Sequence, residues 1–314
     1  MTLSPKIGTA LLIDMLAYCR PANTATETQF IARYIVPTGA LPDAFGNYIS
    51  RIGTAPVLWS CHTDTVHRVE GMQSVSVEKG IATLAAGSKS NCLGADCTTG
   101  VWLMVNMIQR GVEGLYVFHR QEESGGFGSA YIAEKTPELL TGIDFAIALD
   151  RFGGDSIITH QAGGRSASDA FAASIAKQLP DGYFADAGGT FTDTANYTRI
   201  VPDCTNLSVG YLNQHSSAES QCLLTAERLL AAMLALDVSQ LVAERMPDDD
   251  DDWKDKDYGL LAYFDDWKES PAPRTVEQVV RACPELVAEL LESMGYDPAG
   301  LVADFCQTRR DSRY

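Results

Sequence analysis

Four short apolar segments of this chain are each followed by a histidine or a carboxylate. The segments cover residues 56–61, 115–119, 145–149 and 207–211. The side chains that follow them are, in order, His62 with Asp64, Glu122 with Glu123, Asp150, and His215. A further acid, Asp96, lies in segment 93–100, immediately before an expected helix. The sequence therefore offers two imidazoles and several carboxylates that a fold could bring to one place.

This set of side chains has the chemistry of a site for two divalent cations. Imidazoles and carboxylates suit Zn²⁺ and also accept Mn²⁺ or Co²⁺. One carboxylate can bridge two cations roughly 3.5–4 Å apart, and a water between them loses a proton near neutral pH. A carboxylate that binds no cation is then needed to accept that proton and return it to a leaving amine. The doublet Glu122-Glu123 can supply one ligand and one base, because neighbouring residues of an extended backbone point in different directions.

The elements that must position these residues are strands of a central sheet. Each apolar segment is too uniformly apolar for a strand with one buried face, so we expect strands that are covered on both faces. Helical patterns alternate with them over residues 7–16, 100–109, 129–135, 167–178 and 225–236. This alternation predicts an α/β fold with three layers, α/β/α, around a mixed, mostly parallel sheet. Ligands of such sheets bind beyond the carboxyl ends of the strands, where the histidines and acids are expected to meet.

One change of composition divides the chain. Residues 246–257 contain seven Asp and predict a solvated acidic linker. Apolar residues at helical spacing in 275–283 and 285–294 predict a short helical C-terminal extension. We therefore expect a catalytic domain over residues 1–245, and an acidic linker with a helical tail over 246–314. The tail is expected to pack back on the domain or to contact a partner.

The composition narrows the class of protein. Hydrophobic residues make up 46% of the 314 residues, which is enough for a sizeable core. The formal net charge of −17 disfavours binding to nucleic acid or to an anionic membrane surface. No apolar run of about 18 residues and no signal-peptide pattern occur, so no membrane span or secretion is expected. Eight scattered cysteines without CxxC pairs favour free thiols and a cytoplasmic location.

The ordered motifs resemble those of a known family, the di-zinc exopeptidase superfamily. This superfamily contains bacterial leucyl aminopeptidases, peptidase T and glutamate-releasing carboxypeptidases. The resemblance covers about residues 5–240. The matching pieces are, in order, the opening helix, Gly46-Asn47, His62-Thr63-Asp64, Gly94-Ala95-Asp96 with Gly100, Glu122-Glu123-Ser124-Gly125, Asp150, Thr192-Asp193, and the segment 206–215 that ends at His215.

The resemblance implies a role for each residue of the set. His62 and Asp150 would hold one cation, and Glu123 and His215 would hold the other. Asp96 would bridge the two. Glu122 would be the general base and later the general acid. Asp64 would accept a hydrogen bond from the second ring nitrogen of His62 and fix its tautomer.

The sequence also departs from the family pattern. Cys97 stands where the family usually has a second Asp or a similar small polar residue. Only 65 residues separate Asp150 from His215, whereas family members with a lid or dimerisation domain insert about a hundred or more there. A compact form without that domain, closer to an aminopeptidase than to a carboxypeptidase, is therefore expected. Asp193 could shape the pocket or cap a helix.

The remaining histidines and two arginines have simpler interpretations. His67 is expected in a solvated loop and His119 in the packed core. His160 could touch a substrate from a glycine-rich loop, although a structural role is the simpler reading. Arg165 and Arg199 could bind a substrate carboxylate, but solvated or salt-bridged surface positions are expected for both.

Three functions are compatible with these residues. The leading hypothesis is a metal-dependent exopeptidase that cleaves a terminal amide bond of a small peptide or amino-acid conjugate. The same site could instead act as an amidohydrolase or deacylase on a non-peptide amide, because pocket residues and not cations select the substrate. A binding protein on a fold that has lost catalysis is the third, and the complete set of acids and histidines argues against it.

Overall fold

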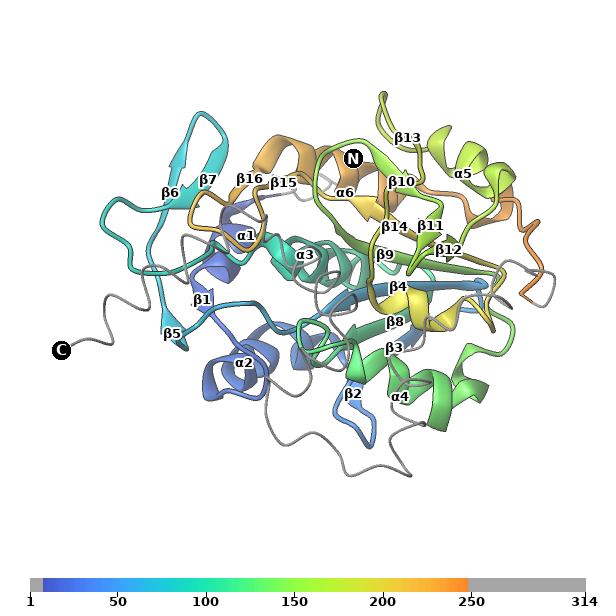
Figure 1. Cartoon of the computed structure of the whole chain (residues 1–314), viewed down its shortest axis with the longest axis horizontal. Helices are drawn as coiled ribbons and strands as arrows, with labels where there is room; N and C mark the ends of the chain where they lie inside the picture. Colours follow the sequence, from blue (N-terminus) through green and yellow to red (C-terminus); the bar gives the residue numbers. More distant parts are fainter. Residues whose placement is uncertain (1–7, 248–314) are drawn as a thin grey trace, which may run out of the picture. The chain divides into compact units, whose positions relative to one another are not determined.

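The computed structural model describes residues 8–247, which are built around a mixed eight-stranded sheet (Figure 1). The strand order is β13-β10-β14-β9-β4-β8-β3-β2. The bounds are β2 Leu41–Pro42, β3 Tyr48–Ile52, β4 Val57–His62, β8 Gly114–His119, β9 Phe145–Arg151, β10 Ser156–Ile158, β13 Phe184–Asp186 and β14 Asp203–Ser208. The four central strands β14, β9, β4 and β8 run parallel, and antiparallel pairings join β10 and β3 to this block.

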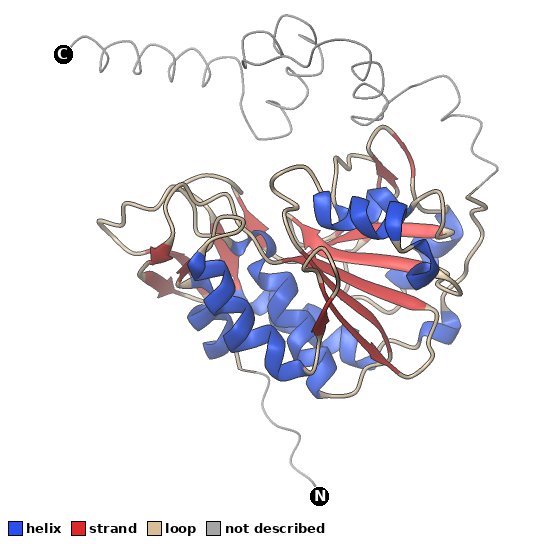
Figure 2. Cartoon of the chain, turned by 90° about the horizontal axis from the view of Figure 1, so that it is seen from below, coloured by secondary structure: helices blue, strands red, loops and turns tan. Residues whose placement is uncertain are grey.

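Helices cover both faces of this sheet, as Figure 2 shows. Their bounds are α1 Ala10–Leu16, α2 Ala25–Phe30, α3 Ala95–Gln109, α4 Phe127–Lys135, α5 Asp169–Ala176 and α6 Leu223–Ala235. Alternate residues of β4 point to opposite faces. Trp59 packs in the larger core with α1, α3, α5 and α6, whereas Leu58 packs in a smaller core with Ile132 of α4. The predicted three-layer α/β architecture is confirmed.

Smaller sheets lie beside the central one. A four-stranded sheet has the order β15-β16-β7-β6, formed by Tyr211–Leu212, Ser220–Cys222, Ile81–Leu84 and Val75–Glu78. Two ribbons pair β1 Tyr18–Cys19 with β5 Gly71–Met72, and β11 His160–Gln161 with β12 Gly164–Arg165. Short helical turns cover Ile31–Ile35, Val36–Thr38, Pro137–Leu140, Asp193–Tyr197 and Val238–Gln240.

Three of the four predicted strands coincide with β4, β8 and β9, but the strand predicted at 207–211 is wrong. The strand of the central sheet is β14, Asp203–Ser208, which is fully buried although most of its residues are polar. These side chains have distant partners: Asp203 accepts from the amide of Ser168, and Thr205 donates to the carbonyl of Ile158. Gly210 adopts a φ of +98° and takes the chain out of the sheet before Tyr211.

The five helices predicted before residue 245 are present; their first residues are displaced by two to five positions and their last residues by at most two. Helix α3 begins at Ala95 and not at residue 100, so Asp96 belongs to its first turn. Helix α5 begins after Ser168, whose side chain accepts a hydrogen bond from the amide of Phe171 and caps the helix. Residues 151–214, all of which the structure describes, form strands and α5 of the same domain. The predicted absence of a lid domain in this interval is confirmed.

The predicted linker and helical tail lie, from residue 248 onward, outside the described residues. Over residues 8–247, no helix has the length and apolar character needed to cross a membrane. The six cysteines in this part of the chain are free thiols.

Candidate metal centre

Asp96 lies between the two histidines and presents one carboxylate oxygen to each. Its Oδ1 is 3.1 Å from Nε2 of His62, and its Oδ2 is 3.3 Å from Nε2 of His215. His62 is the last residue of β4, and Asp96 is held by the first turn of α3. Two imidazoles that are remote in the sequence therefore flank a single carboxylate.

A second carboxylate completes each half of this cluster. Oδ1 of Asp150, in β9, lies 3.3 Å from Nε2 of His62. Oε1 of Glu123 lies 3.4 Å from Nε2 of His215. The five predicted ligands thus form two groups of three, which share Asp96.

The spacing of these atoms fits a pair of tetrahedral cation sites. With Zn²⁺ bonds of roughly 2.0–2.1 Å to nitrogen and oxygen, neighbouring ligand atoms of a tetrahedron lie roughly 3.3–3.4 Å apart. The four distances within the cluster run from 3.1 to 3.4 Å. Oε1 of Glu123, Oδ1 of Asp150 and Nε2 of His215 are also buried without a hydrogen-bond partner. Buried polar atoms rarely lack a partner, so their arrangement fits cation ligands.

The electrostatics of the cluster show the same need for positive charge. Burial and the nearby charge of Asp96 raise the pKa of the Asp150 carboxyl to about 7. Burial opposes protonation of His215, but the ion pairs of its ring with the Asp96 and Glu123 carboxylates raise its pKa to about 11. Carboxylates this close repel one another, so they either take up protons or are neutralised by a nearby positive charge. The cluster therefore favours binding of divalent cations.

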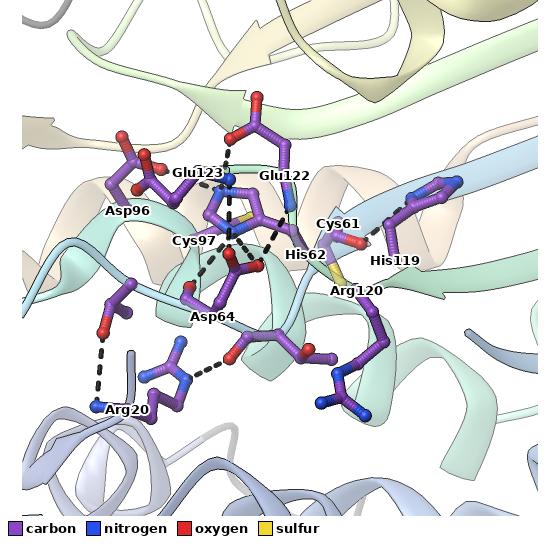
Figure 3. A network of polar contacts seen from close by, with 12 residues as sticks. Arg20, Cys61, His62, Asp64, Asp96, Cys97, His119, Arg120, Glu122 and Glu123 are labelled. Carbon is purple, nitrogen blue, oxygen red and sulfur yellow. Dashed lines mark hydrogen bonds and ion pairs between the residues drawn. The ribbon is translucent and has the colours of Figure 1, made fainter. Parts of the chain in front are cut away.

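Asp64 connects the end of β4 to the turn that follows β8 (Figure 3). Its Oδ1 accepts the amide hydrogen of Glu122, and its Oδ2 accepts that of Glu123, both at 3.2 Å. Nδ1 of His62 lies 3.1 Å from the backbone carbonyl of Asp64 and 3.6 Å from its carboxylate. The carboxylate thus orients the two glutamates, and the expected hydrogen bond from His62 is made to the carbonyl instead.

Glu122 and Glu123 diverge for a reason other than the one predicted. They lie in a turn and not in extended backbone, and Gln121 before them has a φ of +62°. Glu122 directs Oε2 toward Nε2 of His62, at 3.9 Å, whereas Glu123 faces His215. Burial, together with the charges of Glu123 and Asp150, raises the pKa of Glu122 well above its usual range. Glu122 is therefore placed beside the cluster without being one of its closest members.

No protein-family model matches the sequence, and no curated protein matches it. The fold is similar to that of the aminopeptidase PepT from Bacillus cereus, with a TM-score of 0.62 and 13% identity over 73% of this chain and 97% of that chain. The fold is also similar to that of a tripeptidase from Staphylococcus aureus, with a TM-score of 0.57 and 14% identity over 71% of this chain and 96% of that chain. An aminopeptidase from the archaeon Desulfurococcus kamchatkensis has a similar fold, with a TM-score of 0.54 and 14% identity over 76% of this chain and 94% of that chain.

The chain shares the fold of these peptidases. The fold that the resemblance of the motifs implied is thereby confirmed. At 13–14% identity, the similarity gives the fold alone and leaves the chemistry to be argued from the side chains.

One predicted ligand reaches the cluster by an unexpected route. His215 does not follow a strand of the central sheet. It lies in the loop between β15 and β16 of the four-stranded sheet, with a φ of +60°. The expectation that four strand ends of one sheet deliver the ligands is therefore wrong for His215 and right for His62, Glu122 with Glu123, and Asp150.

Cys97, which stands where the family usually has a small polar residue, does not replace a ligand of either group. Its Sγ lies within 4.8 Å of potential ligand atoms of His62 and Asp150. The thiol is fully buried and donates to the carbonyl of Leu149 at 3.3 Å. Burial, a hydrogen bond with Cys61 and the charge of Asp150 raise its pKa well above the usual range, which keeps it a neutral thiol.

A buried polar network supports the two strand ends that carry His62 and Glu122. Arg20 is completely buried and donates to the carbonyl of Thr63 at 2.6 Å and to the hydroxyl of Thr98 at 2.7 Å. Glu27 accepts from the hydroxyl of Thr63 at 2.6 Å and pairs with Arg120 at 2.7 Å. These contacts tie α2 to the ends of β4 and β8, so the two ends have a fixed spacing.

The structure also settles the simpler interpretations. His67 is only 4% exposed and hydrogen-bonds with Thr65 and Gln73, so its expected place in a solvated loop is wrong. It escapes solvent because its ring packs against the α3 N-terminus at Gly94. His119 is in the core, as predicted, and its Nε2 is 2.6 Å from the hydroxyl of Tyr197.

The other polar residues that the sequence singled out have local partners or are exposed. Asp193 begins a short helical turn and pairs with His119 at 3.2 Å, next to Thr192. Arg165 pairs with Asp169 on the surface at 3.0 Å, and Arg199 is exposed, as expected of both. His160 lies half-buried in β11, with Nδ1 3.0 Å from the hydroxyl of Thr159.

Proposed function

We propose that this protein is a metal-dependent exopeptidase that cleaves a terminal amide bond of a small peptide or amino-acid conjugate. One observation carries the proposal: Asp96 offers one oxygen to each of two histidines, and a second carboxylate completes each group. His62, Asp96 and Asp150 would hold one divalent cation, and His215, Asp96 and Glu123 the other. Zn²⁺ suits this donor set best, and Mn²⁺ or Co²⁺ would also fit.

Three protein ligands per cation leave a position open for water and substrate, as in catalytic zinc sites. When bound, the two cations would polarise the scissile carbonyl and acidify the attacking water. The contribution of the protein is to fix the ligands, which are at most one-fifth exposed.

Glu122 is the general base in this proposal. It lies beside the cluster at 3.9 Å from His62, close enough to reach a water there and too far to be one of the nearest ligands. Because burial raises its pKa, the carboxyl can take a proton from the attacking water and return it to the leaving amine. Asp64 holds its backbone in place through the hydrogen bond from the Glu122 amide.

The deciding experiment compares Glu122→Gln with wild type. The amide has the same shape and cannot accept the proton, so turnover should fall by at least about 10²–10⁴-fold. Cation content, measured by elemental analysis and located by anomalous scattering, should stay at the wild-type value. Glu134→Gln, on the surface of α4, is the matched control and should change neither quantity.

Aminopeptidase action is the form that we propose first, because structures with this fold include aminopeptidases and a tripeptidase. A panel of aminoacyl amides, di- and tripeptides and N-acyl amino acids would test it. Turnover of N-acyl compounds alone would instead favour the amidohydrolase or deacylase hypothesis. A protein that binds no divalent cation and hydrolyses none of them would favour a non-catalytic binding role. A cytoplasmic location remains part of the proposal, in keeping with the free thiols among residues 8–247.

A further inference from the structure

Glu219 is a buried carboxylate that touches the segment carrying the shared ligand. It is 1% exposed. Its Oε2 accepts the amide hydrogen of Gly94 at 2.7 Å, and its Oε1 accepts those of Ala95 and Asp96 at 3.0 and 3.3 Å. Nothing in the sequence marked this residue except its place four positions after His215.

The local structure of α3 explains why an acceptor is needed there. Gly94 precedes the helix in a left-handed conformation, and no neighbouring side chain caps the helix. Asp96 and Cys97 have non-helical backbone angles, so the first turn is distorted. The first amides of a helix lack partners within it and carry partial positive charge. Glu219 supplies both oxygens of a distant carboxylate to these amides.

The same residue fixes the loop that carries His215. The amide of Glu219 donates to the carbonyl of Ser216 at 3.1 Å, and the hydroxyl of Ser216 donates to the carbonyl of Asn213 at 2.7 Å. Strand β16 begins directly after Glu219. The loop is therefore braced internally, and the Glu219 side chain joins it to the start of α3.

We propose that Glu219 is a positioning residue that sets the spacing of Asp96 and His215, and thereby the affinity of the cation position formed by Asp96, Glu123 and His215. Glu219 contacts neither substrate nor cation in this scheme. The inference rests on the proposed function for the identity of the site, and extends it to a residue outside the set of ligands. The position formed with His62 and Asp150 depends less on Glu219, because β4 and β9 pair directly and hold those two ligands.

Glu219→Gln tests this with little change in shape. Both oxygens of Glu219 accept amide hydrogens. The side-chain NH₂ of glutamine is a donor, so in place of one oxygen it would point at a backbone N–H and lose that hydrogen bond. We expect the affinity for the cation at the His215 position to fall about 10–100-fold, as for residues that orient ligands. The affinity at the His62 position, which shares Asp96, should fall by a smaller factor. Turnover should fall at limiting Zn²⁺ or Mn²⁺ and recover as the concentration is raised. A purely structural residue would not give this selective and reversible loss.

Asp203→Asn is the matched control. Asp203 is also fully buried and also accepts backbone amide hydrogens, from Ser168 and Glu244. It lies at the start of β14, and the parallel strands β9 and β4 carry the cluster at their opposite ends. This variant should lower stability while leaving both cation affinities unchanged.

Calorimetric titration with Zn²⁺ or Mn²⁺ alone, followed by anomalous scattering from crystals of each variant, gives the answer. Two cations in wild type, with weakened binding at the His215 position in Glu219→Gln only, support the proposal. Equal affinities in wild type and Glu219→Gln, or an equal loss in Asp203→Asn, would overturn it. A wild-type protein that binds no cation would defeat the proposed function itself. If Glu219→Gln does not fold, Glu219→Asp, which keeps the charge but shortens its reach, is judged by the same criterion.

Discussion

Thr192 donates its hydroxyl to Oδ2 of Asp150 at 2.9 Å, which leaves Oδ1 of Asp150 directed at His62. Both residues are buried, so this hydrogen bond selects one rotamer of a candidate ligand. Thr192→Val keeps the shape and removes the donor. We expect turnover or cation affinity to fall about 10–100-fold, the usual effect of losing a group that orients a ligand. Thr192→Ser restores the hydroxyl and should retain most activity; equal values for the two variants would refute the role.

Asp64 gives a second prediction, because its two oxygens serve two backbone amides. Asp64→Asn leaves one oxygen and turns an NH₂ group toward either the Glu122 or the Glu123 amide. The turn that carries both glutamates should shift, and kcat should fall about 10–100-fold with cations still bound. Steady-state kinetics and elemental analysis on the same preparation check this. Wild-type kcat in Asp64→Asn would show that the turn is held by other contacts.

The central part of the site could be predicted from the sequence for a clear physical reason. Strands β4, β8 and β9 are uniformly apolar because they are covered on both faces, so their ends were easy to locate. Parallel strands bring their carboxyl ends to one edge. His62 and Asp150 are therefore neighbours in space although they are far apart in the chain.

The parts that could not be predicted depend on long-range hydrogen bonds. β14 is polar in sequence, and only the distant partners of Asp203 and Thr205 make its burial possible. The same holds for His67, whose polar ring is satisfied by Thr65 and Gln73. Glu219 resembles a surface residue in a polar segment, because its three amide partners lie more than 120 residues away. Local patterns carry no information about such partners.

Cys97 gives a third prediction, on the departure from the family pattern. Because its thiol is buried, neutral and hydrogen-bonded to Leu149, Cys97→Ser should bind the same number of cations as wild type. Its kcat should stay within about threefold, since the change removes no ligand and ordinary substitutions of this kind cost little. The Co²⁺-loaded wild type should show no thiolate-to-cobalt charge-transfer band. Such a band, lost in Cys97→Ser, would make Cys97 a ligand and contradict this assignment.

His67 gives a prediction on stability against pH. Burial and the nearby charge of Arg20 lower its pKa to about 4, whereas an unfolded histidine has a pKa of about 6.5. The stability that depends on neutral His67 is therefore complete above pH 6.5 and is lost as the pH falls toward 4. Between pH 7 and 4.5 this should cost about 2.5 kcal/mol of unfolding free energy. Urea unfolding of wild type and His67→Gln at pH 7 and pH 4.5 measures this loss. Between the two pH values, the free energy of unfolding of the variant should fall by about 2.5 kcal/mol less than that of wild type. Equal losses in the two proteins would contradict the prediction.

Cation binding itself should release protons, which follows from the charges of the cluster. Without a cation, the pKa of His215 is about 11 and that of His62 is also raised, because neighbouring carboxylates outweigh their burial. Both imidazoles must lose a proton before Nε2 can bind a cation, so loading at pH 7 should release about two protons per chain from the histidines. Asp150, whose pKa is about 7, should release a further fraction of a proton. Affinity should accordingly rise with pH between 6 and 8.

Calorimetric titration of Zn²⁺ in buffers with different ionisation enthalpies measures this release as the slope of the observed enthalpy. His215→Ala should lower the slope by about one proton, because one of the two imidazoles is gone. His160→Ala, which removes a histidine outside the cluster, is the control and should leave the slope unchanged. A slope of zero in wild type would mean that both imidazoles are already neutral, and the carboxylates would then need another source of positive charge.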